Sequence, residues 1–344
     1  MQEKLPIHSV TIEAPARLHL GFLDLNGDLG RRFGSIGMAI SAPSTIIKIT
    51  TANDDQVYGP ETRRTLKALK SFKDTLSIKS CYEVGVKNAI PAHAGLGSGT
   101  QLALAIGAGL AAIAQKHNSI ANLGQTLSRG ARSAIGIGAF DNGGFIIDGG
   151  KGSLNTPPPI LSRTKFPEDW RILLVMDPNT TGVHGDRENL AFSDLPDMPP
   201  EEVGLICRLT LMQLLPGLLE KDISTFGAAI TRIQEIVGSH FATKQGGDIW
   251  ASQHVASVVK QMGKMGAHGI GQSSWGPTGF AFTQNQAAAE NLYESLAQDA
   301  KGMGLDIIIA HGRNHGAIIK RYENTNSSGI TVSDRNTKKQ ESQT

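Results

Sequence analysis

Residues 91–112 read PAHAGLGSGTQLALAIGAGLAA, a glycine-rich turn that runs directly into an apolar, alanine-rich segment. The spacing predicts a helix over about 101–116. Gly95, Gly97 and Gly99 precede it and free the backbone for left-handed turns. The first N–H groups of such a helix lack intrahelical partners, and the helix dipole adds positive charge at the same end. This stretch is therefore typical of a loop that holds phosphate or pyrophosphate.

The residues after Gly97 separate this loop from the Walker type. A Walker loop ends in Gly-Lys-Ser/Thr, whereas Ser98, Gly99 and Thr100 stand here, so that nucleotide-binding loop is excluded. The hydroxyl groups of Ser98 and Thr100 can still donate hydrogen bonds to a ligand. The loop alone leaves two interpretations equally open: a phosphate site, or a glycine-rich turn that only starts a hydrophobic helix.

The composition of the 344-residue chain fits a globular protein with two domains. Lys and Arg total 33 against 31 Asp and Glu, and the net charge of +2 provides no field that would hold nucleic acid non-specifically. The two cysteines, Cys81 and Cys207, lack the spacing of a metal site and suit reduced thiols. No secretory signal and no membrane-length apolar run is evident, which predicts a cytoplasmic protein without a membrane partner.

Strand formers alternate with other residues over 9–25 and 35–52, on either side of a glycine-dense connection at 26–37. This pattern predicts paired strands joined by a functional loop. Further along, a helix is expected within 60–76, a strand within 77–92, a helical segment near 120–132 and a strand at 143–148.

Four prolines within 157–167 mark a linker, which predicts an N-terminal domain over 1–155 and a C-terminal domain over 168–322. The C-terminal domain is expected to contain strands at 171–178, 305–311 and 316–322, helices near 200–219, 221–238, 250–266 and 286–301, and a glycine-rich loop at 269–282. This order predicts a helix-covered antiparallel sheet and an α+β fold. The polar residues 323–344 are expected to form a mobile tail.

The opening stretch resembles the central phosphate-binding motif of the GHMP superfamily, PxxxGLGSSAA, and residues 269–282 fall where that superfamily has its C-terminal glycine-rich motif. The residues that match the central motif are Pro91, Gly95, Leu96, Gly97 and Ser98. The resemblance implies a two-domain fold with an N-terminal domain of the ribosomal protein S5 domain 2 type and a ferredoxin-like C-terminal domain. It assigns phosphate binding to Gly95, Leu96, Gly97, Ser98, Gly99 and Thr100.

The pattern of the GHMP kinases is broken at two places. These kinases commonly carry a catalytic aspartate eight residues ahead of a Gly-Gly pair, and counting back from Gly143 reaches Ile135 instead. The second serine of the phosphate loop, which suits metal and phosphate oxygens, is replaced by Gly99. Both differences argue against phosphoryl transfer.

A narrower resemblance is to the β-ribofuranosylaminobenzene 5′-phosphate synthase family, and it covers roughly residues 8–320. The segments that carry it are 16–40, ARLHLGFLDLNGDLGRRFGSIGMAI, together with 132–150, 182–192 and 273–282. It implies condensation of phosphoribosyl pyrophosphate with 4-aminobenzoate or a close analogue, release of pyrophosphate and CO₂, and a role in methanopterin biosynthesis. It also implies Mg²⁺ as cofactor and a homodimer. An ATP-dependent small-molecule kinase and a catalytically silent ligand-binding protein are the rival functions.

Arg17, His19 and Arg132 are the candidate catalytic residues, because an anionic leaving group needs cations and arginine binds phosphate oxygens bidentately. Arg17 and His19 stand two apart on a predicted strand, so their side chains share one face. Arg31 and Arg32 are further phosphate-binding candidates.

Several polar residues are candidates for substrate or metal binding. Asp24 and Asn26 suit ribose hydroxyls or hydrated Mg²⁺, and Asp141 suits the metal, although short polar residues before glycine equally suit plain turns. The remaining candidates for substrate contacts are Ser273, Ser274, Trp275, Gly276, Asn314 and His315. A core tryptophan and a polar hairpin tip are the alternatives for Trp275 and for the last pair.

Overall fold

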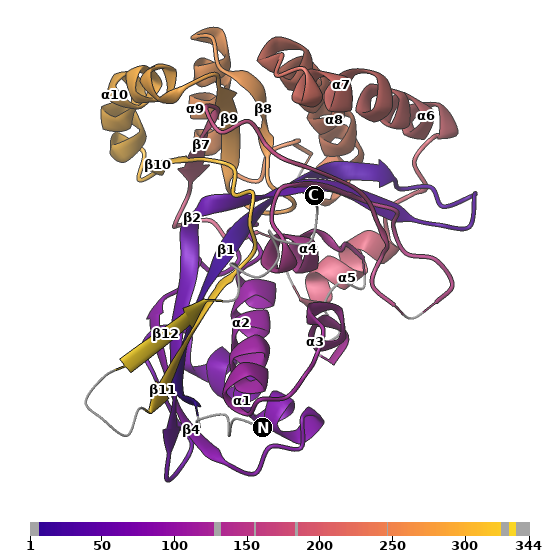
Figure 1. The fold of residues 1–344 in the computed structure, drawn as a ribbon. Helices are drawn as coiled ribbons and strands as arrows, with labels where there is room; N and C mark the ends of the chain where they lie inside the picture. The colour runs from indigo at the N-terminus through magenta and orange to yellow at the C-terminus, as the bar shows by residue number, and fades with distance from the viewer. Residues whose placement is uncertain are drawn as a thin grey trace.

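Two β-sheets with helices on their faces organise the protein (Figure 1). The structure, a computed structural model, describes residues 7–126, 132–154, 156–182, 185–245, 247–324 and 330–334. The first sheet contains β1 (Ile7–Asp24), β2 (Phe33–Ala52), β3 (Gln56–Tyr58), β4 (Cys81–Asn88), β5 (Phe145–Asp148), β6 (Ile160–Thr164), β11 (Ile318–Asn324) and β12 (Ile330–Asp334). The second contains β7 (Arg171–Met176), β8 (His268–Gln272), β9 (Gly279–Thr283) and β10 (Asp306–Ala310).

Helices of the N-terminal half cover one face of the first sheet, whose main strand order is β12-β11-β1-β2-β4-β3. They are α1 (Thr62–Thr75), α2 (Ser98–Ile113), α3 (Ile120–Thr126) and α4 (Ile135–Asp141). α2 is apolar around its circumference and almost wholly buried, as expected of a helix in the middle of a core. It begins at Ser98, three residues before the predicted start, because the left-handed turn at Gly97 (φ 80°) already directs the chain into the helix.

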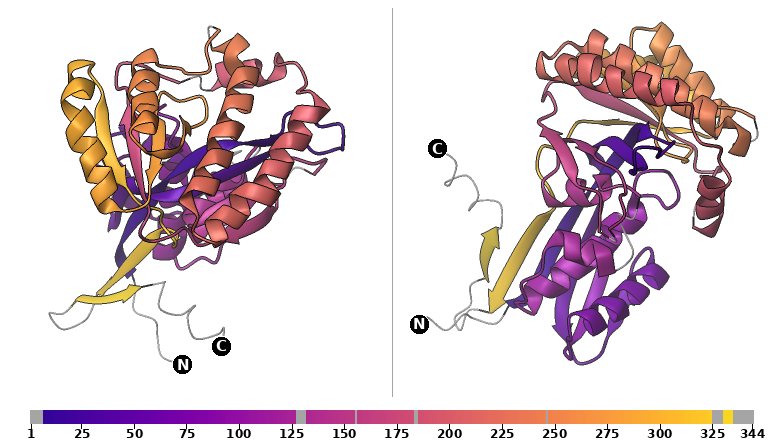
Figure 2. Two further views of the ribbon diagram at one scale, coloured as in Figure 1. Left: turned by 90° about the horizontal axis from the view of Figure 1, so that it is seen from above. Right: turned by 90° about the vertical axis from the view of Figure 1, so that its right-hand side faces the viewer.

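The second sheet is antiparallel, in the order β10-β7-β9-β8, and side chains alternate between its faces. Leu173 and Val175 pack against α9 and α10, whereas Ile172 and Leu174 face the opposite way, toward α8 and the first sheet. The helices of this half are α5 (Asp186–Ser193), α6 (Pro200–Leu209), α7 (Leu215–Leu219), α8 (Ile223–Phe241), α9 (Gln253–Lys264) and α10 (Gln286–Gly302). Figure 2 shows the C-terminal helices α6 to α10 gathered on one side of the molecule and the N-terminal helices on the other.

The long β1–β2 hairpin belongs to both halves. Val10 and Ile12 lie in the core with α2, and beyond the register shift between Pro15 and Ala16 the side chains of Leu18 and Leu20 join the core with α8. The hairpin of β1 and β2 therefore extends through both halves of the molecule. The candidate catalytic residues of β1 lie where the two halves meet.

The structure corrects several sequence-based expectations. Residues 269–282 do not form one loop, since β8 and β9 occupy both ends of this stretch, and the proline-rich linker at 157–167 contains β6. Strand β11 pairs with β1 in the first sheet, so the last residues of the predicted C-terminal domain 168–322 lie in the sheet of the N-terminal half. The prediction of a mobile tail is wrong for 323–324 and 330–334, which are strand residues in β11 and β12. Residues 325–329 and 335–344 lie outside the described residues.

Candidate active site

The phosphate loop packs backbone to backbone against the turn between β8 and β9. A side chain at Gly95 would meet the carbonyl oxygen of Ser273 at 2.3 Å, and one at Gly276 would meet the Cα atom of Gly95 at 2.4 Å. Only glycine on both sides permits this approach. The loop at the start of α2 is thus closed from the C-terminal half, and its N–H groups lie at the junction of the two halves.

Arg17 of β1 fastens this loop from the other side. Its Nη1 donates to the carbonyl oxygen of Gly95, its backbone N–H donates to Leu96 O at 3.1 Å, and a side chain at Gly97 would lie 2.9 Å from its Cγ. Burial lowers the pKa of the Arg17 guanidinium to about 10, although the nearby Glu188 carboxylate favours the charged form. Arg17 therefore stays protonated near neutral pH and places a buried positive charge beside the loop.

His19 follows on the same face of β1, as the two-residue spacing predicts. Its side chain is 3% exposed, its Nε2 has no hydrogen-bond partner within the described residues, and its ring centroid lies 4.5 Å from that of Phe22. Burial, and next the positive charges of Arg17 and Arg132, hold the pKa of His19 well below 6.5. The imidazole is thus neutral near pH 7 and can accept or donate one hydrogen bond through Nε2.

This lowered pKa makes stability depend on pH. The unfolded chain binds a proton at His19 near pH 6.5 and the folded chain does not, so the free energy of unfolding falls as the pH drops below about 6.5. For one group this loss is at most about 1.4 kcal/mol per pH unit. We expect the His19→Gln variant to lose less stability than the wild type between about pH 7 and about pH 5, as measured by urea unfolding. Equal losses in the two proteins would show that His19 is not held neutral.

Arg132 brings a second cation to the same cluster. Its Nη2 lies 3.0 Å from Glu188 Oε1 of α5, its guanidinium stacks 4.4 Å from the Phe192 ring centroid, and its Nη1 is buried without a partner. This ion pair is partly buried and internal to the site. An unsatisfied buried guanidinium N–H is costly in a folded protein, and an anion bound beside it would relieve that cost.

Asp148 positions the chain next to Arg132. Its buried carboxylate accepts from the backbone N–H groups of Ala134 at 2.8 Å and of Ser35 and Gly150 at 3.0 Å each. Burial raises the pKa of Asp148, and these hydrogen bonds act in the opposite direction. The residue ties α4 to β2 and β5, so it holds the scaffold of the site.

Ser273 links three segments of the site. Its Oγ accepts from the His19 backbone N–H at 3.1 Å and donates to Gly95 O at 2.7 Å, while the Ser274 N–H donates to His19 O at 3.3 Å. Ser273 is fully buried, so it orients the phosphate loop and β1 relative to each other. The predicted substrate-binding segment therefore lies beside the predicted phosphate loop.

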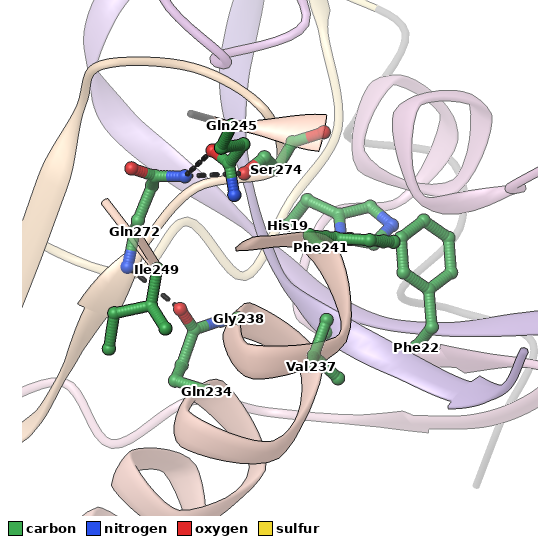
Figure 3. Close-up of a pocket in the computed structure, with 11 residues that line it drawn as sticks. His19, Phe22, Gln234, Val237, Gly238, Phe241, Gln245, Ile249, Gln272 and Ser274 are labelled. Carbon is green, nitrogen blue, oxygen red and sulfur yellow. Dashed lines mark hydrogen bonds between the residues drawn. The ribbon is translucent and has the colours of Figure 1, made fainter. Parts of the chain in front are cut away.

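A pocket opens next to His19, between β1 and α8 (Figure 3). Phe22, Val237, Phe241 and Ile249 provide its apolar lining, and His19, Ser274, Gln234, Gln245 and Gln272 provide its polar groups. The three glutamines were not predicted from the sequence, because they come from α8, the turn after it and β8, and no local motif marks them. Their significance depends on the tertiary fold alone.

Other predicted residues have structural partners. Arg31 donates to Gly149 O and Gly150 O at 2.6 Å each, and Arg32 pairs with Asp197 at 3.3 Å, so both arginines hold the β1–β2 connection to neighbouring turns. Neither has a contact with the phosphate loop among the described hydrogen bonds and ion pairs. Their assignment to phosphate binding stays a prediction.

The metal candidates also serve local turns. Asp24 Oδ1 accepts from the N–H groups of Asn26 and Gly27 at 2.7 and 2.8 Å, Asn26 donates to Met198 O, and Asp141 accepts from Asn142. In the part of the chain that the structure describes, no three His, Cys, Asp or Glu side chains gather in a way that could hold a metal ion.

Trp275, Asn314 and His315 do not line the pocket, and their assignment as substrate contacts stays a prediction. Trp275 is 2% exposed and stacks on Phe241 with 4.2 Å between centroids, because an apolar ring at the junction gains most from burial. Asn314 uses both ends of its amide on the backbone of Phe166, at 2.7 and 2.9 Å. His315 Nδ1 lies 3.1 Å from Gly316 O in the same connection.

Comparison with protein families gives matches in both halves of the chain. Residues 63–149 match the N-terminal domain of the GHMP kinases, and residues 214–302 match the C-terminal domain of the GHMP kinases. A solved homoserine kinase from Cytophaga hutchinsonii has the same fold, with a TM-score of 0.65, 16% identity and coverage of 93% of this chain and 99% of that one.

Two archaeal proteins named β-ribofuranosylphenol 5′-phosphate synthase are more similar in sequence. The one from Archaeoglobus fulgidus is 31% identical over 90% of this chain and 99% of its own length. The one from Methanocaldococcus jannaschii is 32% identical over 89% of this chain and 98% of its own length. The chain therefore belongs to the GHMP superfamily and, within it, to the family of the β-ribofuranosylphenol 5′-phosphate synthases.

Proposed function

We propose that this protein is a cytoplasmic enzyme of methanopterin biosynthesis that joins phosphoribosyl pyrophosphate to a para-substituted benzoate, with release of pyrophosphate and CO₂. The name of its relatives specifies a phenol product, which corresponds to 4-hydroxybenzoate as acceptor, whereas 4-aminobenzoate would give the aminobenzene. The observation that carries the proposal is a pair of cations, the buried Arg17 and the half-buried Arg132, beside a phosphate loop that lacks a catalytic carboxylate.

The reaction needs an electrophile, a ring and a leaving group. Loss of the diphosphate makes C1 of the ribose oxocarbenium-like, and the ring carbon that bears the carboxylate attacks it to form the carbon–carbon bond. CO₂ then leaves, and the electron pair of its bond to the ring restores aromaticity. No protein nucleophile takes part, so catalysis consists of positioning and electrostatic stabilisation.

The residues of the site suit these tasks. The first N–H groups of α2 and the guanidinium of Arg17 face the charge that develops on the diphosphate, and Ser273 fixes the loop that presents them. The neutral imidazole of His19 stands between this cradle and the pocket. Because the described residues provide no ligand set for resident Mg²⁺, the substrate would carry its own Mg²⁺ on the diphosphate.

The main rival function is an ATP-dependent small-molecule kinase. A kinase of this fold needs a base for the attacking hydroxyl group. At the expected position of that base stands Ile135, which is fully buried and packs against Gly37. Asp141, the remaining carboxylate candidate, is exposed and hydrogen-bonded to Asn142. The geometry therefore favours the synthase.

An assay that measures both products separates these functions. Purified protein is incubated with Mg²⁺, phosphoribosyl pyrophosphate and either 4-hydroxybenzoate or 4-aminobenzoate, each labelled in the carboxyl carbon. Equal amounts of labelled CO₂ and pyrophosphate support the synthase. Absence of both products with both acids refutes it, and formation of ADP from ATP with an added alcohol would identify the kinase instead.

We infer that the protein is a homodimer through the segment Pro200–Leu219, which joins α6, a π-helical turn (Thr210–Leu214) and α7. By length and composition alone this segment could also cross a membrane, but Ile206 and Leu218 pack into the core. Its outer side exposes Leu211 (62%) and Met212 (73%) next to one another. A contiguous apolar patch of this kind fits a second copy of the chain.

Glutamate at the exposed positions 211 and 212 should separate the subunits of the proposed dimer. We expect the double variant Leu211→Glu, Met212→Glu to sediment as a monomer where the wild type sediments as a dimer, because two charges on each side cannot be buried in an apolar interface. Met303→Glu, at another exposed apolar position beyond the end of α10, is the control and should remain dimeric. A double variant that sediments like the wild type would place the interface elsewhere.

A further inference from the structure

The pocket beside His19 has a composition that suits one end of an aromatic acid. None of its described lining residues is an acid, a lysine or an arginine, and Phe22 and Phe241 provide aromatic surface. A carboxylate would gain no charge partner there, whereas Arg17 and Arg132 lie close enough to His19 to act on its charge and do not line the pocket. On the proposed function, on which this inference rests, the acid therefore directs its uncharged para end toward the pocket.

The amide of Gln272 has a fixed orientation. Its Oε1 accepts from the backbone N–H of Ala251 at 2.7 Å, and its Nε2 donates to the carbonyl oxygen of Ser274 at 3.2 Å. A backbone N–H can only donate and a backbone carbonyl can only accept, so two independent anchors define which end of the amide is which. The Nε2 of Gln272 therefore also donates to its second neighbour, the side chain of Gln245, at 3.1 Å.

This contact determines what Gln245 offers to the pocket. Because its Oε1 accepts from Gln272, its NH₂ group is the end that remains, and that group has no hydrogen-bond partner within the described residues. Figure 3 shows this nitrogen directed into the space between Gln272 and His19. Gln234 does not compete, since its amide is used on Leu20 O at 2.7 Å and on the N–H of Gln272 at 2.8 Å.

We propose that Gln245 determines acceptor specificity by donating a hydrogen bond from its NH₂ group to the para substituent of the aromatic acid, which selects a hydroxyl group over an amino group. A phenolic oxygen has lone pairs that accept this hydrogen bond. The nitrogen of an arylamine has its lone pair delocalised into the ring and presents N–H donors, so it would face the donors of Gln245 with neither side satisfied. The donor also favours the phenolate form, which directs the most electron density to the ring carbon that attacks.

The test compares the two acids in variants of Gln245. We expect the ratio of kcat/KM for 4-hydroxybenzoate to that for 4-aminobenzoate to be well above one in the wild type and to fall at least about tenfold in Gln245→Glu, because its carboxylate has no N–H to donate and accepts from a phenol O–H and an amine N–H alike. Gln245→Met keeps the length without a donor and should lower the ratio mainly by weakening 4-hydroxybenzoate. Gln261→Glu, an exposed glutamine on α9 that receives the same change, should leave the ratio unaltered.

A ratio that stays within twofold of the wild type in both Gln245 variants would overturn the inference while leaving the proposed function intact. Calorimetric binding of both acids, in the presence of pyrophosphate, distinguishes the two failures. If the wild type turns over neither acid but binds 4-hydroxybenzoate more tightly in a manner that Gln245→Glu abolishes, the hydrogen bond from Gln245 is supported as a binding preference and the proposed function falls. If neither acid binds, the pocket does not take the aromatic acid and the inference is wrong.

Discussion

Replacement of Arg17 by alanine is expected to lower turnover about a hundredfold without unfolding the protein, because one charge-stabilising donor disappears from the leaving-group site. Arg17 is buried, remains charged near neutral pH and donates to Gly95 O, so its loss removes a cation and loosens the loop at once. Steady-state release of pyrophosphate measures the effect, and thermal unfolding confirms that the fold persists.

Arg17→Lys separates these two contributions. Lysine keeps the charge but cannot maintain the fork geometry toward the loop, so an intermediate loss of turnover is expected. If Arg17→Ala keeps the turnover of the wild type, the leaving group does not depend on this residue and the assignment of the cation is wrong.

Alanine at Gly276 is expected to lower turnover to a similar extent from a position without any charge. Its Cβ would lie 2.4 Å from the Cα atom of Gly95 and 2.5 Å from the carbonyl carbon of Ala94, and these backbone atoms cannot yield as a flexible side chain would. The two loops must therefore separate, and misplacement of a catalytic loop by about 1 Å can cost about a hundredfold in rate. A loss of stability of about 1–3 kcal/mol should accompany it.

Gly302→Ala is the matched control, because a Cβ at Gly302 meets nothing within 4 Å. Its turnover and unfolding free energy should remain close to those of the wild type. Equal turnover in Gly276→Ala and Gly302→Ala would contradict the close packing of the phosphate loop against the β8–β9 turn.

Local sequence patterns predicted the parts of the fold that local physics determines. The strand periodicity of 9–25 and 35–52 corresponds to β1 and β2, and the glycine-to-alanine transition at 91–112 corresponds to the loop and α2. The register shift at Pro15 and the pairing of β11 with β1 could not be predicted, since both depend on contacts between residues far apart in the chain. Polar composition likewise predicted no strand after 323, whereas the backbone of 330–334 pairs with β11.

In the candidate site, too, local patterns predicted some residues, whereas others depend on contacts between distant parts of the chain. Arg17 and His19 were singled out because alternate strand residues share a face, and the structure joins Arg17 to the phosphate loop directly and His19 to it through Ser273. Glu188 and Phe192 approach Arg132 only through the folding of α5 over the site, and the role of Gln245 follows from a hydrogen-bond chain through Gln272. Trp275 was placed in the right segment but faces the core.

The central claim is that the diphosphate of phosphoribosyl pyrophosphate rests on the main-chain amides at the start of α2, beside Arg17. A crystal structure of the protein with this substrate and Mg²⁺ tests it most directly. We predict diphosphate oxygens within hydrogen-bond distance of the N–H groups of Ser98 and Gly99, with the ribose directed toward His19. A diphosphate bound elsewhere, with these amides facing only water, would contradict the account.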